Sequence, residues 1–138
     1  MAINKKIIVT IISTSVIVLG LVLFVNFDSL DHKILEQTFE INAVYFENNS
    51  YAEIRFQDKS GKTNHVILEI LGMAESFHKE YESSTFVEKI HFQSVPQYGW
   101  QSVPITLIVE HEKLGKIGIK TEIRPVGETM APLIFSKL

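Results

Sequence analysis

Cysteine is absent from this chain of 138 residues. Its absence excludes disulfide bonds, thiolate metal sites, a cysteine nucleophile, covalent haem attachment and a lipid anchor on an N-terminal cysteine. The chain must therefore be stabilised by an apolar core. Its length suits a single domain of ordinary size once a membrane segment is set aside.

Motifs for catalysis and for nucleotide binding are also missing. The chain has neither G-x-S-x-G nor H-E-x-x-H, the local patterns of serine and zinc hydrolases. Ser60-Gly61-Lys62-Thr63 ends like a phosphate-binding loop, but Phe56 stands where that loop requires its first glycine. We therefore predict that the protein is not an enzyme and that it uses no cofactor.

Positive charge is scarce after the first apolar segment. Residues 28–138 hold 11 lysines and arginines against 16 acidic residues, which is a net charge of −5. They contain no basic run either. A negative domain of this kind is a poor partner for nucleic acid, so we predict no nucleic-acid binding.

A charge-free apolar segment of 19 residues runs from Ile7 to Val25. As a helix it would be about 28 Å long, close to the thickness of the hydrocarbon core of a bilayer. Lys5 and Lys6 precede the segment and Asp28 follows it, a charge bias that favours a cytoplasmic N-terminus. We predict a single-pass anchor in the lipid of the cell membrane, with an extracytoplasmic C-terminal domain.

A cleaved secretory signal is the alternative to an anchor. Such a signal has a shorter apolar stretch followed by small residues, whereas Val25-Asn26-Phe27 follows here. The predicted organisation is a cytoplasmic N-terminus at 1–6, a transmembrane helix at 7–27, a tether at 28–33, and a domain at 34–138 with its tail at 125–138.

Apolar residues recur at every second position through most of the outer domain, which is the period of a half-buried strand. The predicted strands lie around 39–45, 52–57, 65–71, 86–92, 105–109 and 117–124. Turn residues separate several of them, as in Asn48-Asn49-Ser50, Asp58-Lys59-Ser60-Gly61 and Leu114-Gly115. From Met73 to Glu82, apolar residues four apart predict a short amphipathic helix or a helical crossover instead.

Six short strands with one crossover favour an antiparallel β-sandwich over a parallel sheet, which needs a helix between each pair of strands. The predicted fold class is therefore mainly β. In architecture the pattern resembles the immunoglobulin-like sandwiches. The cysteine pair and the strand tryptophan of antibody domains are absent, so the resemblance names no family.

The histidines are the candidate metal ligands. None of the five has the H-x-H or H-x-x-x-H spacing of a local site, so a site would have to form across strands. His91 lies on the polar face of its predicted strand, and a second group lies beside a hairpin, namely Glu110, His111 and Glu112. If the two strands pair, the two histidines meet beside carboxylates, as a metal-handling protein would require.

The segment Gln93–Pro104 reads QSVPQYGWQSVP and contains Gln-Ser-Val-Pro twice. Its two prolines stiffen it and keep it out of strand interiors. The loop has the only tryptophan of the chain, Trp100. Trp100 either folds back over one end of the sandwich or forms an exposed aromatic binding site with Tyr98.

The C-terminal tail is too short to span a bilayer and too hydrophobic for a free end. Its apolar residues are Met130, Leu133, Ile134 and Phe135. The tail either packs on its own domain as an edge strand, which Pro132 would permit, or docks on another protein.

Asn48-Asn49-Ser50 is also an acceptor tripeptide for N-glycosylation on an outward-facing turn, although the turn alone explains the asparagines.

The sequence as a whole predicts a membrane-anchored, non-enzymatic binding or scaffolding module, such as an accessory subunit of a membrane complex. A protein partner would bind through the 93–104 loop or the C-terminal tail. Metal handling by the strand histidines is the alternative function.

Overall fold

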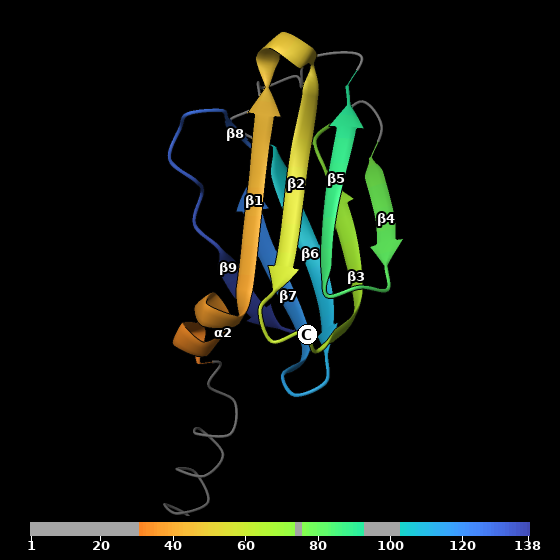
Figure 1. Cartoon of the computed structure of the whole chain (residues 1–138), viewed down its shortest axis with the longest axis vertical. Helices are drawn as coiled ribbons and strands as arrows, with labels where there is room; N and C mark the ends of the chain where they lie inside the picture. Colours follow the sequence, from red (N-terminus) through yellow and green to blue (C-terminus); the bar gives the residue numbers. More distant parts are fainter. Residues whose placement is uncertain (1–30, 74–75, 93–102) are drawn as a thin grey trace, which may run out of the picture. The chain divides into compact units, whose positions relative to one another are not determined.

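Strands make up most of the computed structural model, which describes residues 31–73, 76–92 and 103–138 (Figure 1). The elements are α2 (His32–Thr38), β1 (Phe39–Phe46), a 3-10 turn η1 (Glu47–Asn49), β2 (Tyr51–Asp58), β3 (Thr63–Ile70), β4 (Phe77–Tyr81), β5 (Thr85–His91), β6 (Pro104–His111), β7 (Gly115–Glu122), β8 (Arg124–Pro125) and β9 (Ile134–Lys137). The predicted anchor at 7–27 lies outside the described residues. Within the three described ranges, no helix is long and apolar enough to cross a membrane.

The strands form two sheets that lie one in front of the other in Figure 1. The first sheet has the strand order β5-β2-β1-β8, and the second has the order β4-β3-β6-β7-β9. Neighbouring strands are antiparallel except for β1 and β8, which are parallel. The six predicted strands correspond to β1, β2, β3, β5, β6 and β7. The prediction of a mainly β chain with the two sheets of a sandwich is therefore confirmed.

Alternating side chains from both sheets form the core, as the period of two predicts. The buried apolar residues of β1 and β6 are Phe39, Ile41, Ala43, Tyr45, Ile105, Leu107 and Val109. In the first sheet Phe56 stacks on Phe39 at 6.1 Å and on Phe86 at 5.5 Å between ring centroids. Phe86 also stacks on Tyr81 of β4 at 3.8 Å, so this row of rings joins the two sheets.

Strand β4 replaces the helix predicted between Met73 and Glu82, so that prediction was wrong. In a strand, positions i and i+4 also share a face, and the spacing of Phe77 and Tyr81 therefore fits both periods. All of β4 pairs with β3 in an antiparallel ladder. This non-local pairing decides the conformation, because each paired backbone group is hydrogen-bonded across the sheet.

Two pairs of strands close the two sides of the sandwich. On one side β4 and β5 connect the sheets, and Glu88 of β5 accepts hydrogen bonds from Tyr81 Oη at 2.7 Å and Lys79 Nζ at 2.8 Å. On the other side the tail connects them, because β8 pairs with β1 and β9 pairs with β7. The prediction that the tail packs on its own domain as an edge strand is therefore confirmed.

Two of the predicted hairpin turns contain a residue with a positive φ angle. At the β1–β2 turn the left-handed residue is Ser50, with φ of 52°, and not one of the asparagines. At the β6–β7 turn it is Gly115, with φ of 77°. Both turns were predicted at the correct place, although the left-handed residue of the first was expected to be asparagine.

Candidate functional site

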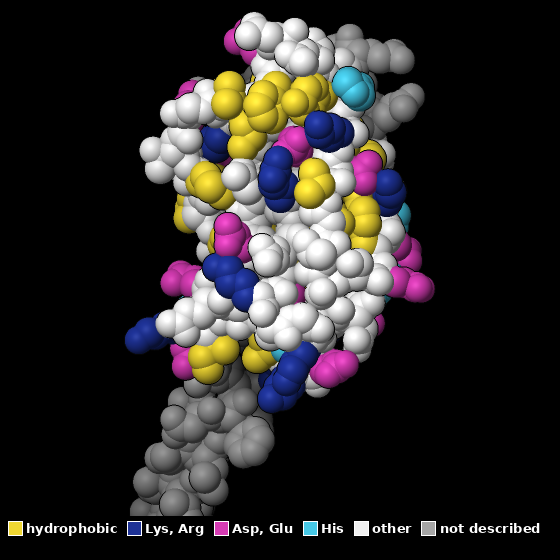
Figure 2. All heavy atoms as spheres, viewed as in Figure 1, with side chains coloured by type: hydrophobic (Ala, Val, Ile, Leu, Met, Phe, Trp, Pro, Cys, Tyr) yellow, Lys and Arg dark blue, Asp and Glu magenta, His cyan; other side chains and the backbone are white. Residues whose placement is uncertain are grey.

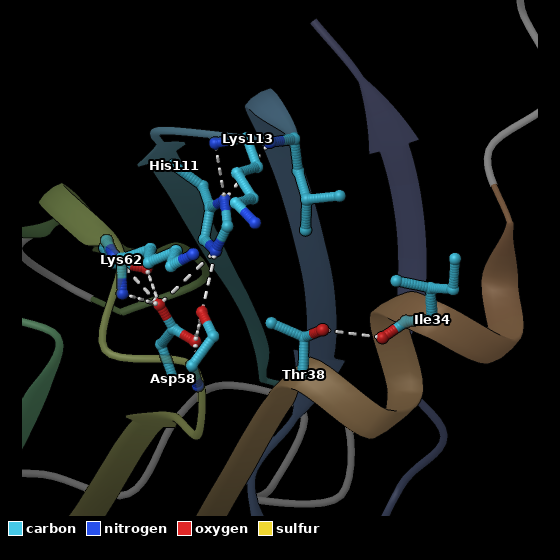
Figure 3. Close-up of polar contacts among 9 residues, drawn as sticks. Ile34, Thr38, Asp58, Lys62, His111 and Lys113 are labelled. Carbon is cyan, nitrogen blue, oxygen red and sulfur yellow. Dashed lines mark hydrogen bonds and ion pairs between the residues drawn. The ribbon is translucent and has the colours of Figure 1, made fainter.

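Asp58, the last residue of β2, is the centre of a polar cluster (Figure 3). Its side chain is fully buried. One carboxylate oxygen accepts hydrogen bonds from the backbone N and Oγ of Ser60, both at 2.7 Å. The other accepts from the backbone N of Lys62 at 2.9 Å and from the N and Oγ1 of Thr63 at 2.8 and 2.9 Å. Burial by itself would raise the pKa of Asp58, but these hydrogen bonds lower it to about 2.

His111, at the end of β6, completes this cluster from the second sheet. Its Nδ1 accepts hydrogen bonds from the backbone N atoms of Lys113 and Leu114, both at 3.1 Å. The ring proton therefore lies on Nε2, which is 2.9 Å from Ser60 Oγ and 3.5 Å from Asp58 Oδ2. The edge of the ring also contacts the aromatic ring of Phe39. We call Asp58, Ser60, Thr63 and His111 the inter-sheet polar cluster.

The inter-sheet polar cluster has the residue types of a catalytic triad but not the geometry of one. In a triad the aspartate and the serine lie on opposite ring nitrogens, so that the free nitrogen can remove the serine proton. Here both lie at Nε2, Nδ1 is occupied by backbone donors, and the Ser60 hydroxyl donates to Asp58. Because His111 Nε2 carries the ring proton, the imidazole cannot remove the Ser60 proton, so the geometry favours a structural role in joining β2 to β3 and β6.

The four residues proposed as metal ligands do not converge. His91 is on β5 in the first sheet, whereas His111 is on β6 in the second, so the strand pairing on which that site depended does not form. Glu110 points outward and lies 3.3 Å from Lys116 Nζ, while His111 points inward. Among the described residues, no group of three or more histidines and carboxylates could hold a metal ion.

A second histidine group lies on the outer face of β3 and β4. Glu80 carboxylate oxygens lie 3.1 Å from His65 Nε2 and 3.5 Å from His78 Nε2, and His78 Nδ1 lies 3.1 Å from Glu69. The hydrogen bonds that His78 donates to the Glu69 and Glu80 carboxylates raise the pKa of His78. The hydrogen bonds that Glu80 accepts from His65 and His78 lower the pKa of Glu80. The group ties an edge strand to its neighbour. Sequence reasoning missed it because the predicted helix hid the pairing of these residues.

The four tail residues predicted to bind a partner have different positions. Phe135 is buried and its ring meets His32 of α2 edge to face, whereas Leu133 is half-buried. Met130 and Ile134 are 49% and 62% exposed. The tail thus uses its odd-numbered apolar residues for its own domain and leaves others on the surface.

An apolar stripe crosses the outer face of the second sheet. Ile67, Ile108 and Gly118 are direct cross-strand neighbours on β3, β6 and β7, and the two isoleucines are half-buried. Leu138 lies over Gly118, where an added Cβ would be 3.4 Å from Leu138 Cδ1 and 2.6 Å from Ser136 Oγ. Glycine at position 118 therefore allows the end of the tail to lie flat on the sheet. We call Ile67, Ile108, Ile134 and Leu138 the outer stripe.

An aromatic row lies across the outer face of the first sheet, next to the β1–β2 turn. Phe46 pairs with Tyr51 and Tyr51 pairs with His91, with ring centroids 4.9 and 5.6 Å apart. Lys89 Nζ lies 5.4 Å from the Tyr51 ring. Figure 2 shows hydrophobic side chains gathered below the turn on this face. We call Phe46, Tyr51 and His91 the aromatic row.

Tyr98 and Trp100, the predicted binding residues of the 93–104 loop, lie outside the described residues. The chain matches no protein-family model, no curated protein and no solved structure.

Proposed function

We propose that this chain is a membrane-anchored, non-enzymatic binding module, an accessory subunit that presents an immunoglobulin-like sandwich outside the membrane. The charge-free segment from Ile7 to Val25 supports the anchor, and Lys5 and Lys6 support the orientation. The contact surface for a protein partner is the outer stripe.

The observation that carries this proposal is the exposure of large apolar side chains along the tail. Of the seven exposed large hydrophobic residues in the described ranges, four belong to the tail, namely Val126, Met130, Ile134 and Leu138. Leu138 lies over Gly118, the cross-strand neighbour of the half-buried Ile108, and Ile67 is next in that row. Ile134 lies on the same face opposite Lys120. Exposed apolar side chains gathered on one face of a small domain are typical of a protein contact site.

The side-chain geometry of the described ranges, which contain no catalytic triad, supports the non-enzymatic part of the proposal. The inter-sheet polar cluster is the most chemically suggestive group among the described side chains. Its Asp58, Thr63 and His111 are buried, both ring nitrogens of His111 are engaged, and the exposed Ser60 donates its hydroxyl to Asp58. A reaction centre needs a reachable nucleophile or base beside space for a substrate.

Site-specific photocrosslinking in intact membranes tests the contact surface. A photoreactive amino acid at Ile134 or Leu138 should give a discrete crosslinked protein, whereas one at Val87 should not. Val87 is a matched control, because it is an aliphatic residue 55% exposed on the outer face of the other sheet. Equal crosslinking at all three positions, or none at Ile134 and Leu138, would refute the outer stripe as the partner site.

A further inference from the structure

The β1–β2 turn presents an acceptor tripeptide for N-glycosylation in an accessible form. Asn48-Asn49-Ser50 is the only N-x-S/T tripeptide of the sequence, and all three residues are exposed in the structure. Asn48 lies in the 3-10 turn at the tip of the hairpin, beyond the last ladder pair, Phe46 and Tyr51. A transferase can therefore reach it without unfolding the sandwich.

Phe46 lies two residues before Asn48 and is the last residue of β1. Its half-buried ring stacks on Tyr51, and this pair stands at the end of the hairpin on the outer face of the first sheet. Strand β8 pairs only with Val44 and Tyr45, so within the described residues no strand pairs with Phe46 on that side. Only Glu47 separates Phe46 from Asn48 in the chain, so the first sugar of a glycan on Asn48 is within reach of this ring.

We propose that Asn48 is an N-glycosylation site and that Phe46 packs against the first sugar of the glycan. One face of a pyranose consists of C–H groups. The face of an aromatic ring has a negative electrostatic potential, which attracts these C–H groups. Tyr51, fixed between Phe46 and His91, holds the Phe46 ring in place. The site requires the outward orientation of the domain that the proposed function includes.

The first test asks whether Asn48 is modified. The full chain is expressed in a eukaryotic secretory pathway, and the glycan is detected by a gel shift that an N-glycosidase removes and by peptide mass spectrometry. We expect one glycan, lost in Asn48→Gln and kept in Asn49→Gln, which preserves the tripeptide. An unmodified wild-type chain would overturn the proposal.

A reporter site separates failure at Asn48 from failure of the proposed topology. Ser83→Asn places an asparagine before Ser84 and Thr85, in an exposed turn between β4 and β5. A chain modified at the reporter but not at Asn48 would overturn the site and leave the topology intact. Modification at neither position would overturn both the site and the outward orientation.

A double-mutant cycle tests the role of Phe46. Thermal unfolding midpoints are compared for the glycosylated chain, Asn48→Gln, Phe46→Ala and the double variant. If the ring packs on the sugar, loss of the glycan lowers the midpoint in the wild type and lowers it less in Phe46→Ala. The reporter glycan at Ser83→Asn should show no such dependence on Phe46. Equal effects of glycan loss with and without the ring would refute the packing.

Discussion

The inter-sheet polar cluster can be tested by the substitution Asp58→Asn, which keeps the shape of the side chain and removes its charge. One carboxylate oxygen accepts from Ser60 and the other from the backbone of Lys62 and from Thr63. An amide has one oxygen and one NH2 group. In either orientation the NH2 therefore faces buried donors, which lose their acceptor.

The magnitude follows from the pKa of Asp58, which is about 2 in the folded protein against an ordinary value of 3.8. A difference of roughly 2 units at about 1.4 kcal/mol each corresponds to about 2.5 kcal/mol of stability at neutral pH. Unsatisfied buried donors cost a further 1–3 kcal/mol or so. We expect Asp58→Asn to lose about 3 kcal/mol or more, a fall in Tm on the order of 10 °C.

The sign of the pH dependence follows from the same comparison. Because the folded pKa lies below the unfolded one, the stabilisation is complete above the unfolded value and is lost as the pH falls towards 2. Chemical denaturation of the domain at 31–138, measured at several pH values, should show this acid loss in the wild type. The Asp58→Asn variant should show less of it.

A surface carboxylate provides the matched control. Glu110 is exposed on β6 and pairs with Lys116 in solvent, so Glu110→Gln should change stability by no more than about 0.5 kcal/mol. If Asp58→Asn is as mild as Glu110→Gln, or if wild type and Asp58→Asn lose stability in parallel under acid, the structural role of the cluster is refuted.

Three further predictions concern the tail, β4 and the anchor. Phe135→Ala should lower the free energy of unfolding by about 3 kcal/mol, because Phe135 is buried. Ile134→Ala should lower it by less than about 0.5 kcal/mol, because Ile134 is exposed. Similar losses in thermal unfolding for the two variants would contradict the packing of β9. As the pH rises through the raised pKa of His78, the imidazole loses its positive charge and its ion pairs with Glu69 and Glu80 weaken. The rate of amide hydrogen exchange in β4, corrected for its intrinsic dependence on pH, should therefore increase. His78→Ala should abolish this change, and pH-independent exchange in the wild type would count against the pairs. The full chain should remain in membranes after carbonate washing, and release of a soluble form beginning near residue 28 would indicate a cleaved signal.

The strands were predictable because the alternation of apolar and polar residues depends only on positions close together in the sequence. Side chains alternate across a strand, so the apolar residues of β1, β2, β6 and β7 mark both the strands and their buried faces without knowledge of any partner. Ile41 and Ile119 are examples, since each is buried at a position that the period assigned to the core. The turns at Asp58 and at Gly115 were equally readable, because the residue types that permit them are few.

The predictions from sequence were wrong or missing where contacts between residues far apart in the chain determine the structure. Phe77 and Tyr81 satisfy two local periods, and only pairing with β3 makes them a strand. Ser60 and His111 are 51 residues apart, so no local pattern shows that His111 meets Asp58 and Ser60. Nor does a local pattern show that His91 and His111 lie in different sheets.

Composition and periodicity alone thus determined the class of fold, the expectation of an anchor and the absence of familiar catalytic motifs. The tertiary structure decided which histidines and carboxylates are neighbours, which tail residues are buried and which face carries an apolar stripe. The physical reason is that periodicity reports how each residue relates to its own strand, whereas a site depends on the pairing and register between strands.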